Sequence, residues 1–90
     1  MFEILEQLMK TIRDRKNSSS DSSYTNKLLN DKNLSVAKVK EEIEELIDAV
    51  EKDTNKIHEA ADVIYHLMVY LEANNIKIED VMNELKKRQK

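Results

Sequence analysis

Four acidic residues of this chain form two pairs with the same spacing. Glu42 and Glu45 lie three residues apart, and Glu59 and Asp62 repeat that spacing after 13 intervening residues. Residues three apart share one face of a helix, so each pair would present two carboxylates side by side. Two like charges about 5 Å apart repel by roughly 3 kcal/mol at an effective dielectric near 20, so converging pairs need a counter-charge. Because Mg²⁺ prefers oxygen ligands, the spacing predicts that all four acids bind magnesium between two helices.

Two neighbouring residues extend these acidic stripes by one helical turn. Lys38 precedes Glu42 by four residues and is the nearby cation, and His66 follows Asp62 by four residues. A single histidine on an apolar helix is either a hydrogen-bonded core residue or a catalyst, and both interpretations stay open here. The acids also have a plainer interpretation, because a glutamate-rich helix usually faces solvent. Asp62 argues against it, since apolar residues flank Asp62 in sequence and on the helical wheel.

The elements that must position these residues are all predicted to be helices. The chain has no glycine and no proline, and tight hairpin turns usually need glycine, so the composition disfavours an extensive sheet. Apolar residues recur at helical spacing. That recurrence predicts helices over residues 1–16, 24–30 (short), 36–52, 56–74 and 79–87. We expect Ser35 to cap the second long helix and Asn33 to adopt a left-handed turn before it.

Length and composition limit the classes of protein that this chain can be. Ninety residues suffice for one domain, residues 1–90, and 37% of them are charged. The net charge of −3 disfavours binding to nucleic acid, and the lack of cysteine excludes disulfides and thiolate zinc sites. No apolar run reaches the roughly 18 residues of a membrane span. We therefore expect a cytoplasmic protein without nucleic-acid or membrane partners.

Two further segments predict assembly and motion. Between Ala60 and Leu71 only Asp62 and His66 are strongly polar, so this helix needs more cover than three short helices provide. We therefore expect a homodimer built as a helical bundle. Residues 17–23 read NSSSDSS, a composition that favours local side-chain hydrogen bonds over helix and predicts a mobile loop.

With Glu-x-x-Glu on one helix and Glu-x-x-Asp on the next, the chain resembles the MazG-like all-α nucleotide pyrophosphohydrolases. Within that superfamily it resembles the phosphoribosyl-ATP pyrophosphohydrolases, which act in histidine biosynthesis. The similar segments are SYTNKLL, KVKEEIEEL, EAADVIYHLMVYL and IEDVMNELKKR. Lys40 and Asn75 depart from the family pattern, which commonly has glycine at both positions.

The resemblance implies an all-α MazG-like bundle of about four helices per protomer and Mg²⁺-dependent hydrolysis of phosphoribosyl-ATP to phosphoribosyl-AMP and pyrophosphate. It implies that Glu41, or His66, assists the chemistry beside the four metal ligands. The candidate substrate contacts are Lys38, Arg15, Lys16, Tyr24 and Thr25. Two alternatives remain: a MazG-like enzyme for another nucleoside triphosphate, and a helical dimerisation module without activity.

Overall fold

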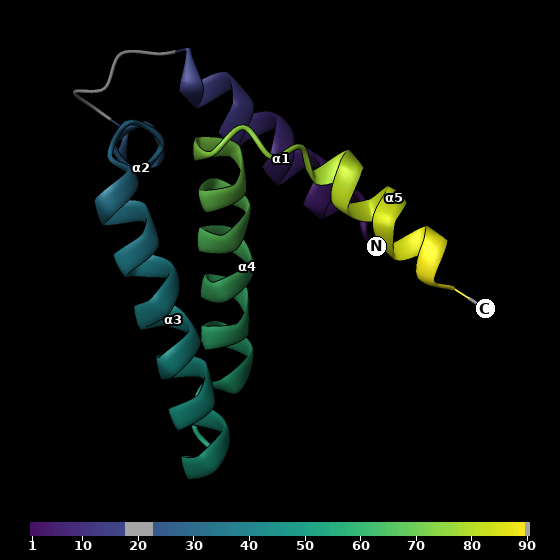
Figure 1. Ribbon diagram of the computed structural model, residues 1–90. Coiled ribbons are helices and arrows are strands. Elements are labelled where there is room, and N and C mark those ends of the chain that lie inside the picture. Colours follow the sequence, from purple (N-terminus) through teal and green to yellow (C-terminus); the bar gives the residue numbers. More distant parts are fainter. Residues whose placement is uncertain (18–22, 90) are drawn as a thin grey trace.

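The computed structural model describes residues 1–17 and 23–89 of the chain (Figure 1). Within these ranges all regular structure is α-helical, which confirms the predicted fold class. The helices are α1 (Glu3–Lys16), α2 (Tyr24–Asn30), α3 (Lys32–Lys52), α4 (Lys56–Ala73) and α5 (Ile78–Arg88). No helix of the described part is long and apolar enough to cross a membrane.

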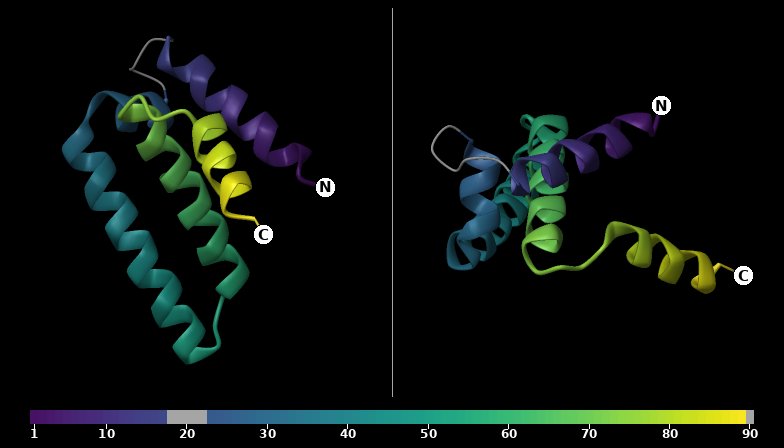
Figure 2. Two further views of the ribbon diagram at one scale, coloured as in Figure 1. Left: turned by 45° about the vertical axis from the view of Figure 1, so that its right-hand side comes forward. Right: turned by 90° about the horizontal axis from the view of Figure 1, so that it is seen from above.

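The two longest helices, α3 and α4, form an antiparallel hairpin that runs the length of the molecule (Figures 1 and 2). The chain reverses between them over Asp53, Thr54 and Asn55. Asp53 and Asn55 both have positive φ, 56° and 43°, in the left-handed region that Asp and Asn enter more readily than most residues. This short turn brings the helix that carries Glu42 and Glu45 directly against the helix that carries Glu59 and Asp62.

The start of α3 differs from the prediction. The helix begins at Lys32, four residues early, because the Asp31 carboxylate accepts a hydrogen bond from the Leu34 amide at 3.0 Å and caps it there. Ser35 is therefore a buried residue of the first helical turns, and Asn33 is helical. Both predictions for these two residues were wrong. The left-handed asparagine that replaces a helix-terminating glycine lies instead at Asn75, with φ of 59°.

The apolar core lies at one end of the hairpin, where α1 and α2 meet the C-terminal half of α4. Its buried members come from these three helices and are Ile12, Leu28, Leu29, Val69 and Ala73. In Figure 1, α2 lies beside the top of α4, and α1 leads away from that point. This core fixes α2 against α4, which decides where Tyr24 and Thr25 stand.

The last helix, α5, leaves the body of the molecule, as the view from above in Figure 2 shows. One ion pair ties it to α1: the Arg13 guanidinium donates to both carboxylate oxygens of Glu79, at 2.8 and 2.6 Å. Between α1, α4 and α5 lies an apolar groove of about 510 Å³. Two of its lining residues on α4, Ile64 and Leu67, are 44% and 42% exposed. The apolar circumference of α4 is therefore incompletely covered within one chain.

Candidate metal centre and active site

The hairpin buries Glu42 of α3 against α4, whereas Glu45 stays exposed. The buried residues of α3 are Ser35, Glu42 and Ala49, spaced by seven residues, which is close to two helical turns. Ile43 and Ile47, one and five residues after Glu42, remain exposed instead. Because α3 turns this stripe inward, Glu42 is only 7% exposed although its side chain is a carboxylic acid.

All four acids of the two predicted pairs meet in two overlapping groups. Carboxylate oxygens of Glu42, Glu45 and Glu59 lie within 4.8 Å of one another, and Glu59 also groups with Asp62 and His58 within that limit. One oxygen each of Glu42 and Glu59 is buried without a hydrogen-bond partner in the described residues. A buried carboxylate oxygen left unpaired is costly, so a ligand that supplies positive charge would stabilise this arrangement.

The environment of these acids shifts their protonation. Burial, followed by the hydrogen bond and the negative charge of Glu45, raises the pKa of Glu42. Burial and the neighbouring charges of Glu45 and Asp62 likewise raise the pKa of Glu59. Both shifts arise from the same crowding of like charges at the α3–α4 contact. A divalent cation bound between these carboxylates would lower the pKa of Glu42 and of Glu59.

The donors at this centre fit magnesium. Carboxylates from two helices offer hard oxygen ligands, and Glu42 and Glu59, which belong to one converging group, each also have a buried oxygen without a hydrogen-bond partner in the described residues. One further residue, His58, lies beside these carboxylates, although its side chain is 72% exposed. The His58 Nε2 lies 3.3 Å from the Asp62 carboxylate, and the four-residue spacing between the two was the signal available in the sequence.

Lys38 and Glu41 lie beside the four acids Glu42, Glu45, Glu59 and Asp62, which we call the acidic cluster, and they pair with each other. The Lys38 ammonium donates to the Glu41 carboxylate at 3.1 Å, and this hydrogen bond raises the pKa of Lys38. Without substrate, the Glu41 carboxylate is therefore paired with Lys38. Its assignment as a residue that assists the chemistry stays a prediction.

Tyr24, Thr25 and His66 meet where α2 crosses α4. The Tyr24 hydroxyl lies 3.2 Å from His66 Nε2, and the Thr25 hydroxyl hydrogen-bonds the Tyr65 hydroxyl. His66 is buried, and its other ring nitrogen contacts the Asp62 backbone carbonyl at 2.9 Å. The structure thus brings Tyr24 and His66 to the edge of the acidic cluster.

The remaining candidate substrate contacts lie elsewhere. Lys16 donates to the Glu72 carbonyl and the Asn75 side chain, at the C-terminal end of α4, far along the helix from Asp62. The Arg15 carbonyl accepts a hydrogen bond from the Asn26 side chain, which joins the end of α1 to α2. In this structure Lys16 does not face the acidic cluster. The predicted mobile loop, residues 17–23, lies outside the described residues except for its two ends.

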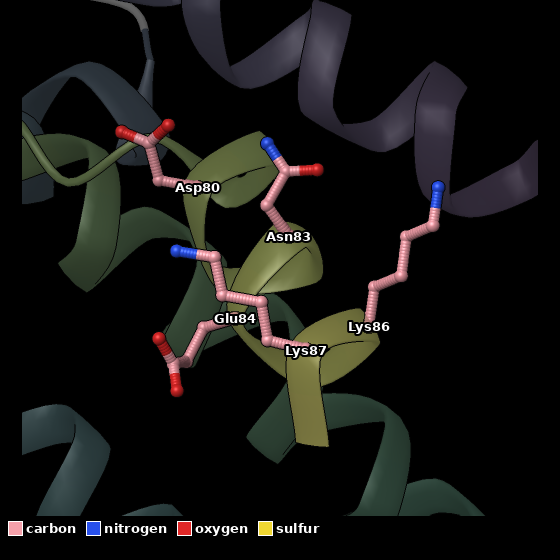
Figure 3. A pocket seen from close by; sticks show the side chains of 5 residues that line it. All are labelled: Asp80, Asn83, Glu84, Lys86 and Lys87. Carbon is pink, nitrogen blue, oxygen red and sulfur yellow. The ribbon is translucent and has the colours of Figure 1, made fainter. Parts of the chain in front are cut away.

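A separate hollow lies along α5 (Figure 3) and contains none of the predicted site residues. Its lining is polar and comes from one helix: Asp80, Asn83, Glu84, Lys86 and Lys87. Figure 3 shows these side chains fanning out from a single stretch of ribbon. Because no second element closes the hollow, it lacks the convergent groups of a binding site.

The described residues form no strand, and two antiparallel helices face each other through paired carboxylates. This is the arrangement expected of the class of all-α nucleotide pyrophosphohydrolases. Comparison with known proteins agrees, because residues 5–89 match the family described as phosphoribosyl-ATP pyrophosphohydrolase. The chain belongs to this family.

Individual relatives cover nearly the whole chain. The phosphoribosyl-ATP pyrophosphatase of Clostridium acetobutylicum is 50% identical in an alignment that covers 96% of this chain and 81% of that protein. Its counterpart in Clostridium novyi is 45% identical, over 99% of this chain and 84% of that protein. A histidine biosynthesis bifunctional protein of Pyrococcus furiosus is 40% identical over 97% of this chain, which spans 42% of that longer protein. The family's unit therefore also occurs as part of larger proteins.

Proposed function

We propose that this chain hydrolyses phosphoribosyl-ATP to phosphoribosyl-AMP and pyrophosphate, and that Glu42, Glu45, Glu59 and Asp62 hold the Mg²⁺ that the reaction needs. The observation that carries the proposal is the convergence of these carboxylates from α3 and α4, with buried oxygens of Glu42 and Glu59 left unpartnered in the described residues. The substrate comes from family membership and from the names of relatives that are 45–50% identical.

Each part of the site then has a defined task. When bound, the metal neutralises charge on the phosphates and polarises the attacking water. The rigid α3–α4 hairpin holds the four carboxylates in place before substrate arrives, so no binding energy is used to assemble them. Lys38 contacts a substrate phosphate, and that contact withdraws it from Glu41. The released Glu41 carboxylate accepts a proton from the water that attacks phosphorus.

A pyrophosphate-release assay tests this function. Purified protein is given phosphoribosyl-ATP or an ordinary nucleoside triphosphate, each with Mg²⁺ or with a chelator. We expect release from phosphoribosyl-ATP with Mg²⁺ only. Faster release from an ordinary triphosphate would replace the substrate with another nucleotide but keep the site. Absence of release from every substrate would leave a non-enzymatic helical module.

We further propose that the enzyme is a homodimer of the cytoplasm. The apolar groove between α1, α4 and α5 supports the second copy as its occupant, because its margins carry both Glu6 and Lys10. A surface with both signs of charge can pair with its own copy across a two-fold axis. The outward Ile43 and Ile47 of α3 add apolar area that a single chain leaves exposed. The relatives' part in histidine biosynthesis supports the cytoplasm as the compartment.

A further inference from the structure

His66 has a defined hydrogen-bond polarity, because one of its partners can only accept. The Asp62 backbone carbonyl, 2.9 Å from Nδ1, has no proton to give, so Nδ1 must carry the hydrogen and donate it. In the neutral imidazole the other nitrogen, Nε2, is then an acceptor. The hydroxyl that lies 3.2 Å from Nε2 belongs to Tyr24, and beside the neutral ring this hydroxyl is the donor.

The donated proton leaves the Tyr24 oxygen able only to accept further hydrogen bonds. A phenol has one hydrogen and keeps lone pairs on its oxygen after donating it. Burial raises the pKa of Tyr24, so the hydroxyl keeps that hydrogen. Phosphate oxygens also only accept, and therefore they do not suit this position. A hydroxyl group of the substrate does.

The rings around His66 hold this polarity in place. His66 is 8% exposed, and the Tyr65 ring meets it edge to face at a centroid distance of 4.9 Å. Tyr24 approaches it from α2 at 6.1 Å, also edge to face, yet Tyr24 is 48% exposed. Lys38 and Glu42 are near enough to act on Tyr24 electrostatically. The tyrosine thus joins a buried, immobilised histidine to an open position beside the acidic cluster.

We propose that His66 is a positioning residue that acts through Tyr24: it accepts a hydrogen bond from the Tyr24 hydroxyl and so leaves the Tyr24 oxygen as an acceptor for a ribose hydroxyl of the substrate. This inference rests on the proposed function, since it concerns recognition of a ribosylated nucleotide. It separates His66 from the chemistry at phosphorus. Both of its ring nitrogens are engaged in hydrogen bonds, one with Tyr24 and one with the Asp62 backbone carbonyl.

A double-mutant cycle on kcat/KM for phosphoribosyl-ATP tests the proposal. Tyr24→Phe removes the acceptor and His66→Leu removes its orientation. Each should lower kcat/KM roughly three- to tenfold, the worth of one neutral hydrogen bond, mainly through a higher KM. The double variant should be no worse than Tyr24→Phe alone. His66→Gln, whose side-chain oxygen can accept from Tyr24, should return kcat/KM to within about threefold of wild type.

The matched control is Leu29→Ala, which loosens the packing of the same helix, α2, without touching either polar group. Its effect on kcat/KM should add to that of Tyr24→Phe. Additive losses for His66→Leu and Tyr24→Phe, or a His66→Gln variant as impaired as His66→Leu, would overturn the positioning role. A loss confined to kcat would also overturn the positioning role and would indicate that His66 takes part in the chemical step. A wild-type protein without activity would instead refute the proposed function.

Discussion

Glu42 on α3 and Glu59 on α4 each bury one carboxylate oxygen at the contact of the two helices, and neither oxygen has a hydrogen-bond partner in the described residues. Oxygens of the two residues approach within 4.8 Å together with Glu45. Two buried like charges without compensation oppose the very contact that brings them together. This relationship supports a cation at the site, and it leads to three predictions about metal, protons and activity.

Removing one metal-binding charge should abolish catalysis without disturbing the fold. For Asp62→Asn we expect kcat/KM to fall by roughly 100-fold or more, since losing even an outer-shell partner of a metal costs about 10–100-fold. Helicity by circular dichroism should be unchanged. Glu44→Gln is the control, because Glu44 is exposed on α3 and lies outside the converging groups. A wild-type kcat/KM in Asp62→Asn would exclude Asp62 from the metal centre.

Magnesium should stabilise the protein against unfolding, because it binds the folded hairpin and not the separated acids. At a concentration of 100 Kd the free energy of unfolding should rise by about 2.7 kcal/mol, seen as a higher Tm in a thermal melt. Glu42→Gln should raise the Tm of the metal-free protein by relieving repulsion and should weaken the response to Mg²⁺. A wild-type Tm that does not change when Mg²⁺ is added would contradict the proposed metal centre.

The raised pKa values of Glu42 and Glu59 should make stability and metal binding depend on pH in opposite directions. Between the ordinary and the raised pKa the folded state holds more protons than the unfolded chain, so the metal-free protein loses stability as pH rises through that window. Mg²⁺ competes with those protons, and its affinity should rise over the same window. Calorimetric titration and chelator-treated melts measure the two trends. The pH dependence of stability and that of Mg²⁺ affinity should both weaken in Glu42→Gln. Equal pH dependences in wild type and variant would contradict the assignment of Glu42 to the metal centre.

The ion pair between Arg13 and Glu79 should control the docking of α5. Arg13 lowers the pKa of Glu79 to about 2, so the pair's contribution is present above the ordinary carboxyl range and is lost as pH falls toward 2. At neutral pH, Glu79→Gln should speed amide hydrogen exchange in α5 by roughly two- to fivefold, as expected for an exposed pair. Glu84→Gln, which breaks only a contact with Arg88 inside α5, is the control. Similar exchange in both variants would show that α5 is held by other contacts.

The apolar groove should make the protein a dimer in solution. Sedimentation at micromolar concentration should give a species of twice 10.6 kDa. Leu67→Glu places a charge in the groove and should yield monomer or unfolded chain. Ile57→Glu serves as the control, because Ile57 is 88% exposed and lies outside the groove. A folded wild-type monomer of 10.6 kDa would be incompatible with the dimer.

The sequence by itself determined the helical fold, because the absence of glycine and proline and the recurrence of apolar residues at helical spacing are local properties. It also determined the two acidic pairs, since spacing along one helix decides which side chains share a face. The turn from Asp53 to Asn55 then brought the pairs together as expected. The start of α3 was misplaced because Asp31 and Ser35 are both good caps, and only the structure shows which one accepts an amide.

Contacts between distant segments were decided by the tertiary structure alone. The rotation of α3 that buries Glu42 and exposes Ile47 depends on packing against α4. A helical wheel of α3 alone does not predict that rotation. Tyr24 meets His66 only because the core of Leu28 and Val69 fixes α2 across α4. For the same reason Lys16, adjacent to the serine-rich loop in sequence, pairs with Glu72 and not with the acidic cluster. Local spacing specifies a face, but long-range packing specifies what that face meets.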